Sequence, residues 1–184
     1  MLIRGGSMKK GFTLVLAFLL VVTAAAIVAG CGSDTAQAQQ YMKKGDVQLQ
    51  NVESLASAWS AQVNSIGADP AKIAGEVQKA KAAGDDLLKT SQAAKSEFEK
   101  IRGLNGVGDY KKYADLRIAE LDIIGQIVLK MYEFLDKRIA MVSSGDLSFY
   151  PALQQQAQDA VNPISEKGQK IEQEADQLKS DKKL

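Results

Sequence analysis

The fold is decided by residues 73–102, which read IAGEVQKAKAAGDDLLKTSQAAKSEFEKIR. Small or apolar residues recur there by alternating steps of four and three, at Ile73, Val77, Ala80, Gly84, Leu87, Ser91, Ala94, Phe98 and Ile101. These steps keep the side chains on one stripe of an α-helix, and a stripe of this length is typical of helices that pack along one another. With Pro70 as the first helical residue, the pattern predicts a long helix over residues 70–102.

Similar stripes lie on both sides of this segment. The stripe before it comprises Met42, Gly45, Leu49, Val52, Ala56, Trp59, Val63 and Ile66, and the last one comprises Leu153, Ala157, Val161, Ile164, Gly168, Ile171, Ala175 and Leu178. The segment 109–143 has a wider apolar face, which predicts contact with more than one neighbouring helix. Turn residues separate the stripes, so we expect further helices over about 40–66, 109–143 and 150–180.

Long helices joined by short loops pack as antiparallel neighbours. The fold class we predict is therefore all-α: an antiparallel, up-down-up-down four-helix bundle with long coiled-coil-like helices, spanning residues 40–184. At 1.5 Å per residue the bundle would be about 45 Å long. No segment alternates with a period of two strongly enough to predict a strand.

The composition excludes several kinds of chemistry. The chain has no histidine and one cysteine, so it holds no histidine-based triad, no His-containing zinc site, no His-ligated haem and no internal disulfide. Its 23 basic and 22 acidic residues are nearly balanced, which argues against a nucleic acid partner. We expect no enzyme activity, no metal site and no cofactor.

Arg117 and Arg138 fall on the apolar stripe of the segment 109–143. A buried arginine needs a paired carboxylate or an anionic ligand, because an uncompensated buried charge is costly. One interpretation is a polar pocket for a small anionic or amino-acid-like ligand, with Glu120 or Asp122 nearby. The other is that both side chains reach outward and pair with acids on adjacent helices.

The first thirty residues have the parts of a secretory signal. Lys9 and Lys10 form a basic region, an apolar run extends from Phe12 to Val28, and Val28, Ala29 and Gly30 precede Cys31. Met8 gives a more compact start than Met1, so residues 1–7 are expected to lie before the true initiator.

The stretch Val28-Ala29-Gly30-Cys31 resembles the lipobox of bacterial lipoprotein precursors. The resemblance implies diacylglyceryl transfer to Cys31 and cleavage after Gly30. Residues 31–39 would then be a lipidated cysteine and a short tether. The resemblance covers only residues 8–31, and we recognise no family for the mature domain.

Two other interpretations of the segment stay open. Residues 9–15 resemble a type IV pilin leader cut after Gly11, although Leu16 stands where that family carries glutamate. The run Phe12 to Val28 is also just long enough to span a bilayer as an uncleaved anchor.

The function we expect is that of a lipid-anchored module of the cell envelope that binds or supports other components without catalysis. It would lie on the extracytoplasmic face of the cell membrane, or at the outer membrane if the host has one. Its partners would be the membrane, through the lipid, and an envelope protein, with a homodimer through spare apolar surface as a further possibility. The alternatives are a sensory or carrier bundle for a small ligand, and a pilin-like or simply anchored subunit.

Overall fold

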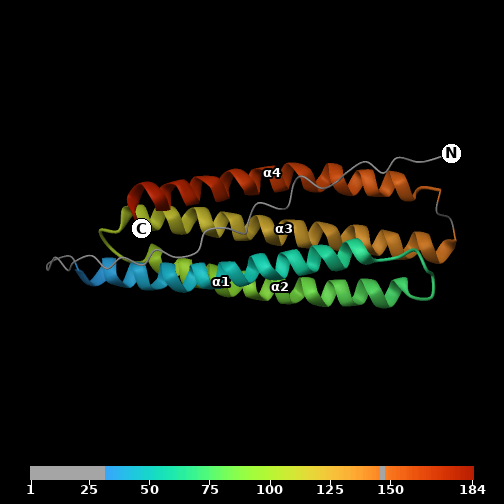
Figure 1. Ribbon diagram of the computed structural model, residues 1–184, viewed down its shortest axis with the longest axis horizontal. Helices are drawn as coiled ribbons and strands as arrows, with labels where there is room; N and C mark the ends of the chain where they lie inside the picture. The colour runs from blue at the N-terminus through green and yellow to red at the C-terminus, as the bar shows by residue number, and fades with distance from the viewer. Residues whose placement is uncertain (1–31, 146–147) are drawn as a thin grey trace. The chain divides into compact units, whose positions relative to one another are not determined.

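The computed structural model describes residues 32–145 and 148–184. In this part of the chain there are four helices and no strand: α1 (Gly32–Ser65), α2 (Ile73–Arg102), α3 (Gly108–Ser144) and α4 (Tyr150–Lys182). They belong to one compact unit, Cys31–Leu184. The helices run alternately in opposite directions, as Figure 1 shows. The predicted all-α, up-down-up-down four-helix bundle is confirmed.

The helices pack in chain order, α1 on α2, α2 on α3 and α3 on α4. Figure 1 shows α3 between α4 and the pair formed by α1 and α2. No Cα atom of α4 lies within 8 Å of a Cα atom of α1, whereas α1 and α3 do approach this closely. The backbones of the first and last helices therefore stay apart, and the wide apolar face of α3 serves several neighbours, as predicted.

The core follows the stripes that the sequence predicts, most closely in α2. All nine stripe residues of α2, from Ile73 to Ile101, are buried. In and directly after α1, every stripe residue from Met42 to Ile66 is buried except Ala56, which is half-buried. Trp59 is part of this core, and its indole nitrogen donates to the backbone carbonyl of Ala80 at 3.0 Å. An alternating helical period is thus enough to identify the inward face of both helices.

The fourth helix is the exception. Leu153, Ala175 and Leu178 are buried, but every stripe residue between Leu153 and Ala175 is only half-buried. This is because α4 packs closely on α3 alone. One side of its stripe is therefore not covered by α1, as it would be in a bundle in which α1 and α4 also packed together.

Two predicted boundaries are wrong. The sequence predicts a tether up to residue 39, but α1 already begins at Gly32, and Ala38 is fully buried. The helix expected from residue 70 begins at Ile73, because residues 70–72 form a turn in which the Asp69 carboxylate accepts from the amide of Ala71 at 2.9 Å. Small and polar residues that precede an apolar stripe can extend its helix when one of their side chains is buried in the core.

Candidate functional site

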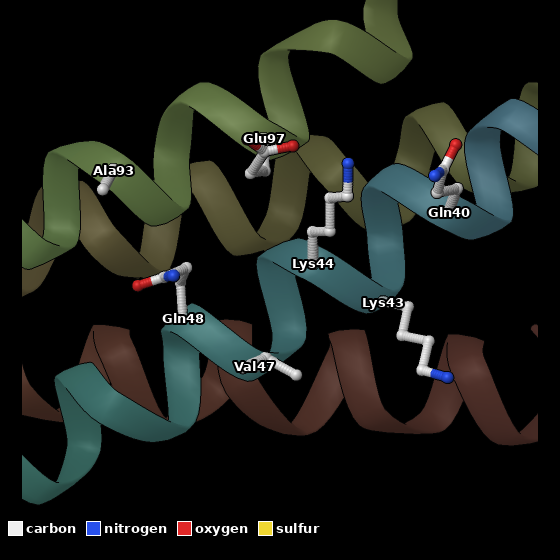
Figure 2. A pocket seen from close by; sticks show the side chains of 7 residues that line it. All are labelled: Gln40, Lys43, Lys44, Val47, Gln48, Ala93 and Glu97. Carbon is white, nitrogen blue, oxygen red and sulfur yellow. The ribbon is translucent and has the colours of Figure 1, made fainter.

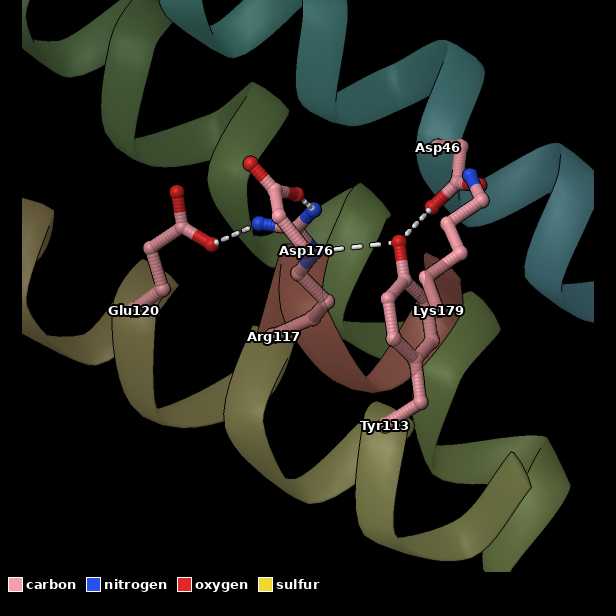
Figure 3. A network of polar contacts seen from close by, with 6 residues as sticks. All are labelled: Asp46, Tyr113, Arg117, Glu120, Asp176 and Lys179. Atoms are coloured by element: carbon pink, nitrogen blue, oxygen red, sulfur yellow. Dashed lines mark hydrogen bonds and ion pairs between the residues drawn. The ribbon is translucent and has the colours of Figure 1, made fainter. Parts of the chain in front are cut away.

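The most heavily charged part of the interior surrounds Arg117 in α3, which is only 6% exposed. Its Nε donates to the hydroxyl of Tyr113 at 3.0 Å, and its Nη1 donates to Glu120 at 2.7 Å. The remaining nitrogen, Nη2, donates to Asp176 of α4. Figure 3 shows the three partners arranged around the guanidinium. Each nitrogen of Arg117 is therefore occupied by a side chain of the protein.

The network continues to α1 through Tyr113 and Asp46. The Tyr113 hydroxyl donates to one carboxylate oxygen of Asp46 at 2.7 Å, and Lys179 of α4 donates to the other at 2.5 Å. Tyr113 thus accepts from one charged group and donates to another. Because the backbones of α1 and α4 do not approach each other, side chains carry the link between these helices.

Acidic groups outnumber basic ones around Arg117. Besides Asp46, Glu120 and Asp176, the carboxylates of Glu53 in α1 and Glu172 in α4 lie close enough to act electrostatically on the cluster. The cations that face these carboxylates are Arg117 and Lys179. At neutral pH the cluster would carry excess negative charge unless some carboxylates hold protons.

Burial and this excess raise the pKa of two carboxyl groups. Desolvation is the main cause at Glu120 and raises its pKa to about 7, although the guanidinium of Arg117 acts in the opposite direction. The pKa of Glu53 is also raised, first by burial and then by the charge of Glu172. Burial likewise raises the pKa of Tyr113, so its hydroxyl keeps its proton and remains a donor to Asp46. The cluster can therefore take up protons near neutral pH.

Arg138 lies near the other end of α3 and has a different role. Its Nη2 donates to the carbonyl of Ile66 and, at 3.3 Å, to that of Gly67. Its guanidinium also lies 5.0 Å from the ring centre of Tyr150. A cation at the last carbonyls of a helix offsets the negative end of the helix dipole. Arg138 therefore holds the residues that directly follow α1 instead of joining Arg117, and its buried Nε has no hydrogen-bond partner among the described residues.

The structure brings together Arg117 and Glu120, as the sequence suggested, and keeps Arg138 apart from them. Sequence reasoning missed the other members of the cluster, although they share a signal. On α1 and α4 the charged members directly follow stripe residues: Asp46 after Gly45, Glu53 after Val52, Glu172 after Ile171, Asp176 after Ala175 and Lys179 after Leu178. This position is the flank that α1 and α4 turn toward each other.

A separate open groove of about 530 Å³ lies between α1 and α2. Figure 2 shows the residues that line it: Gln40, Lys43, Lys44, Val47 and Gln48 from α1, and Ala93 and Glu97 from α2. Val47 is 50% exposed. One oxygen of Glu97 accepts from Lys100 at 2.5 Å, while its Oε2 is buried and has no hydrogen-bond partner among the described residues.

The residues of the expected lipidation signal, Val28, Ala29, Gly30 and Cys31, lie outside the described residues. Within the described ranges, no group of three or more potential ligand side chains is placed to hold a metal ion. None of the four helices carries an apolar stretch long enough to cross a bilayer. In comparisons with known proteins, no family model, no curated protein and no solved structure matches this chain.

Proposed function

We propose that this protein is a helical-bundle module anchored by a lipid at Cys31 to the extracytoplasmic face of a cell membrane, where it binds another envelope component without catalysing a reaction. The observation that carries the proposal is the position of α1. The helix begins at Gly32, directly after the cysteine that ends the lipobox-like sequence. Lipid attachment would then join the membrane to the first turn of the bundle.

The contacts of the buried Arg117 favour a protein that binds its partner through the surface over one that binds a small ligand in an internal pocket. All three nitrogens of Arg117 are engaged by side chains of the protein, and Arg138 is engaged by the residues that directly follow α1. Arg117 thus has no nitrogen left without a hydrogen-bond partner for an anionic ligand, whereas the buried Nε of Arg138 has no partner among the described residues. Of the two residues that favoured a sensory bundle, Arg117 is engaged within the fold at every nitrogen.

The same reasoning applies to catalysis. Glu120 has a pKa of about 7, which suits an acid or base near neutral pH. However, Glu120 is 7% exposed and hydrogen-bonded to Arg117, so a substrate would have to open the bundle to reach it. Its position favours a structural part in the network.

The mass of the mature N-terminal peptide, isolated from native membranes, tests the anchor. We expect an acylated peptide that begins at Cys31, and we expect a Cys31→Ala variant to stay uncleaved. A peptide that begins at Phe12 would instead identify a pilin-like subunit. An intact segment in the wild-type protein would identify a simple membrane anchor.

A second copy of the chain is one candidate for the bound component. Leu129 in α3 is 56% exposed, and the neighbouring Gly125 and Tyr132 are half-buried. Sedimentation of residues 32–184 at several protein concentrations tests this, with Leu129→Gln as the variant. Self-association that weakens in the variant would support a dimer through α3, whereas a monomer at all concentrations would exclude it.

A further inference from the structure

The groove between α1 and α2 carries positive charge that the protein does not neutralise. Lys43 and Lys44 are exposed and form no ion pair with any described residue, whereas Lys100 of α2 is paired with Glu97. Figure 2 shows Lys44 extending from α1 toward α2, on the side where Glu97 lies. Figure 2 also shows Lys43 extending from α1 in the opposite direction, so the two ammonium groups do not converge on one point. Unpaired positive charge spread along a helix in this way favours an extended anionic partner.

One further feature narrows the chemistry of that partner. Val47 presents an apolar side chain at the same groove, half exposed to solvent. A matching partner therefore combines negative charge with an adjoining apolar part. A membrane surface that contains anionic phospholipids has both.

The groove is also close to the expected anchor. Lys43 lies eleven residues after Gly32 on a continuous helix, which corresponds to about 17 Å at 1.5 Å per residue. With so little chain between Cys31 and the helix, the lysines reach a bilayer surface only if α1 lies along it. A bundle standing upright on its lipid would hold them above the headgroups.

We propose that the groove between α1 and α2 docks on anionic phospholipid headgroups of the membrane that anchors the protein, so that the bundle lies on its side. This inference rests on the proposed anchoring through Cys31. Headgroup phosphates face Lys43 and Lys44, and Val47 enters the interfacial layer. The face formed by α4 then points away from the membrane and remains accessible to a partner.

Binding of residues 32–184 to vesicles tests the groove without the lipid anchor. This fragment contains all four helices of the compact unit. We expect it to bind vesicles of phosphatidylcholine mixed with phosphatidylglycerol more tightly than vesicles of phosphatidylcholine alone, and to be released by salt. Because Cys31 is absent, the result is independent of the peptide mass that tests anchoring.

The variant Lys43→Gln/Lys44→Gln should bind the anionic vesicles about 30-fold more weakly, given the usual contribution of a lysine near an anionic surface. The matched control is Lys167→Gln/Lys170→Gln on α4, which removes two exposed lysines that also form no ion pair among the described residues. We expect this control to bind like the wild type.

Equal weakening in the two variants would overturn the proposal, because binding would then depend on net charge and not on the groove. Absence of binding to the anionic vesicles would also overturn it. Soluble glycerol phosphate should compete poorly. Full competition by this compound would show a site for free phosphate esters and would contradict docking on a membrane.

Discussion

The hydroxyl of Tyr113 in α3 donates a 2.7 Å hydrogen bond to Asp46 in α1, whose other carboxylate oxygen accepts from Lys179 in α4. A single aspartate thus receives donors from two other helices. It also joins α1 to α4, whose backbones do not approach each other.

Asp46→Ala should therefore destabilise the bundle more than Lys179→Ala. Loss of Asp46 leaves the buried Tyr113 hydroxyl without an acceptor, which costs about 1 to 3 kcal/mol, whereas the ammonium of Lys179 can turn to water. Their coupling in a double-mutant cycle should be below about 1 kcal/mol, because the lysine side chain is 38% exposed. Urea denaturation measures all of these differences. Equal costs for the two single variants would contradict a role for Tyr113 in the link.

Arg117→Leu should lower the free energy of unfolding by about 3 to 5 kcal/mol, since it leaves Glu120 buried without its counter-charge. The matched control is Arg102→Leu, whose ion pair with Asp115 is half exposed and should contribute below about 1 kcal/mol. The double variant Arg117→Leu/Glu120→Leu should recover part of the loss. Chemical denaturation of the three proteins compares them, and a cost for Arg117→Leu as small as that of Arg102→Leu would refute the prediction.

The stability of the bundle should increase as the pH falls from about 8 to about 5.5. The pKa of Glu120 is about 7 in the folded protein against an ordinary value of 4.5, so the folded state binds a proton that the unfolded state lacks. The stabilisation is fully present below the unfolded pKa and is lost as the pH rises through the folded pKa. Glu53, whose pKa is also raised, acts in the same direction.

In Glu120→Gln this dependence should be markedly weaker, because the amide cannot titrate. Glu99→Gln provides the control, since Glu99 is an exposed glutamate of α2 in the same bundle. Thermal melts at a series of pH values measure the slopes. If Glu120→Gln and Glu99→Gln both retained the wild-type slope, the proton would belong to another group.

Gly84→Ala should destabilise the bundle by about 1 to 3 kcal/mol through overpacking. A Cβ atom there would lie 2.3 Å from the Tyr132 hydroxyl and 3.0 Å from the Trp59 indole nitrogen. Tyr132 cannot retreat cheaply, because its hydroxyl donates to the carbonyl of Lys81 at 2.6 Å. The indole nitrogen of Trp59 is likewise held by a carbonyl of α2.

Gly125→Ala is the matched comparison. A Cβ atom at Gly125 meets Leu88 at an ordinary 3.7 Å, so the higher helix propensity of alanine should stabilise the protein by about 0.5 to 1 kcal/mol. Midpoints of thermal unfolding should thus move in opposite directions for the two variants. A shared direction would show that helix propensity, and not the space at each glycine, determines the outcome.

The inward faces of α1 and α2 could be predicted because a helix repeats its burial with a fixed period. The half-burial of Val161 and Ile164 in α4 could not, since the pattern within a helix indicates which side faces inward but not how near the next helix lies. The sequence predicts an up-down-up-down bundle but not how far α1 lies from α4. Polar residues along the facing flanks, such as Glu53 and Glu172, favour a wider separation there.

The candidate site was predictable only in part. Arg117 stands out because a charge on an apolar stripe is unusual, and Glu120 lies one turn away on the same helix. Tyr113, Asp46 and Asp176 come from three different helices, and their meeting depends on how the helices are rotated and aligned. Arg138 has the same stripe position as Arg117, yet its register places it beside the carbonyls of Ile66 and Gly67, directly after α1.

Packing in chain order keeps most contacts of the bundle between neighbouring segments of the sequence. Chains with such low contact order fold on the microsecond to millisecond scale, because few long loops must close before contacts form. The last helix to emerge, α4, adds to α3 without having to find α1 at close range. The bundle can therefore assemble progressively from its N-terminal end, and the Asp46 link to Lys179, which spans the greatest sequence distance in the charged network, should form last.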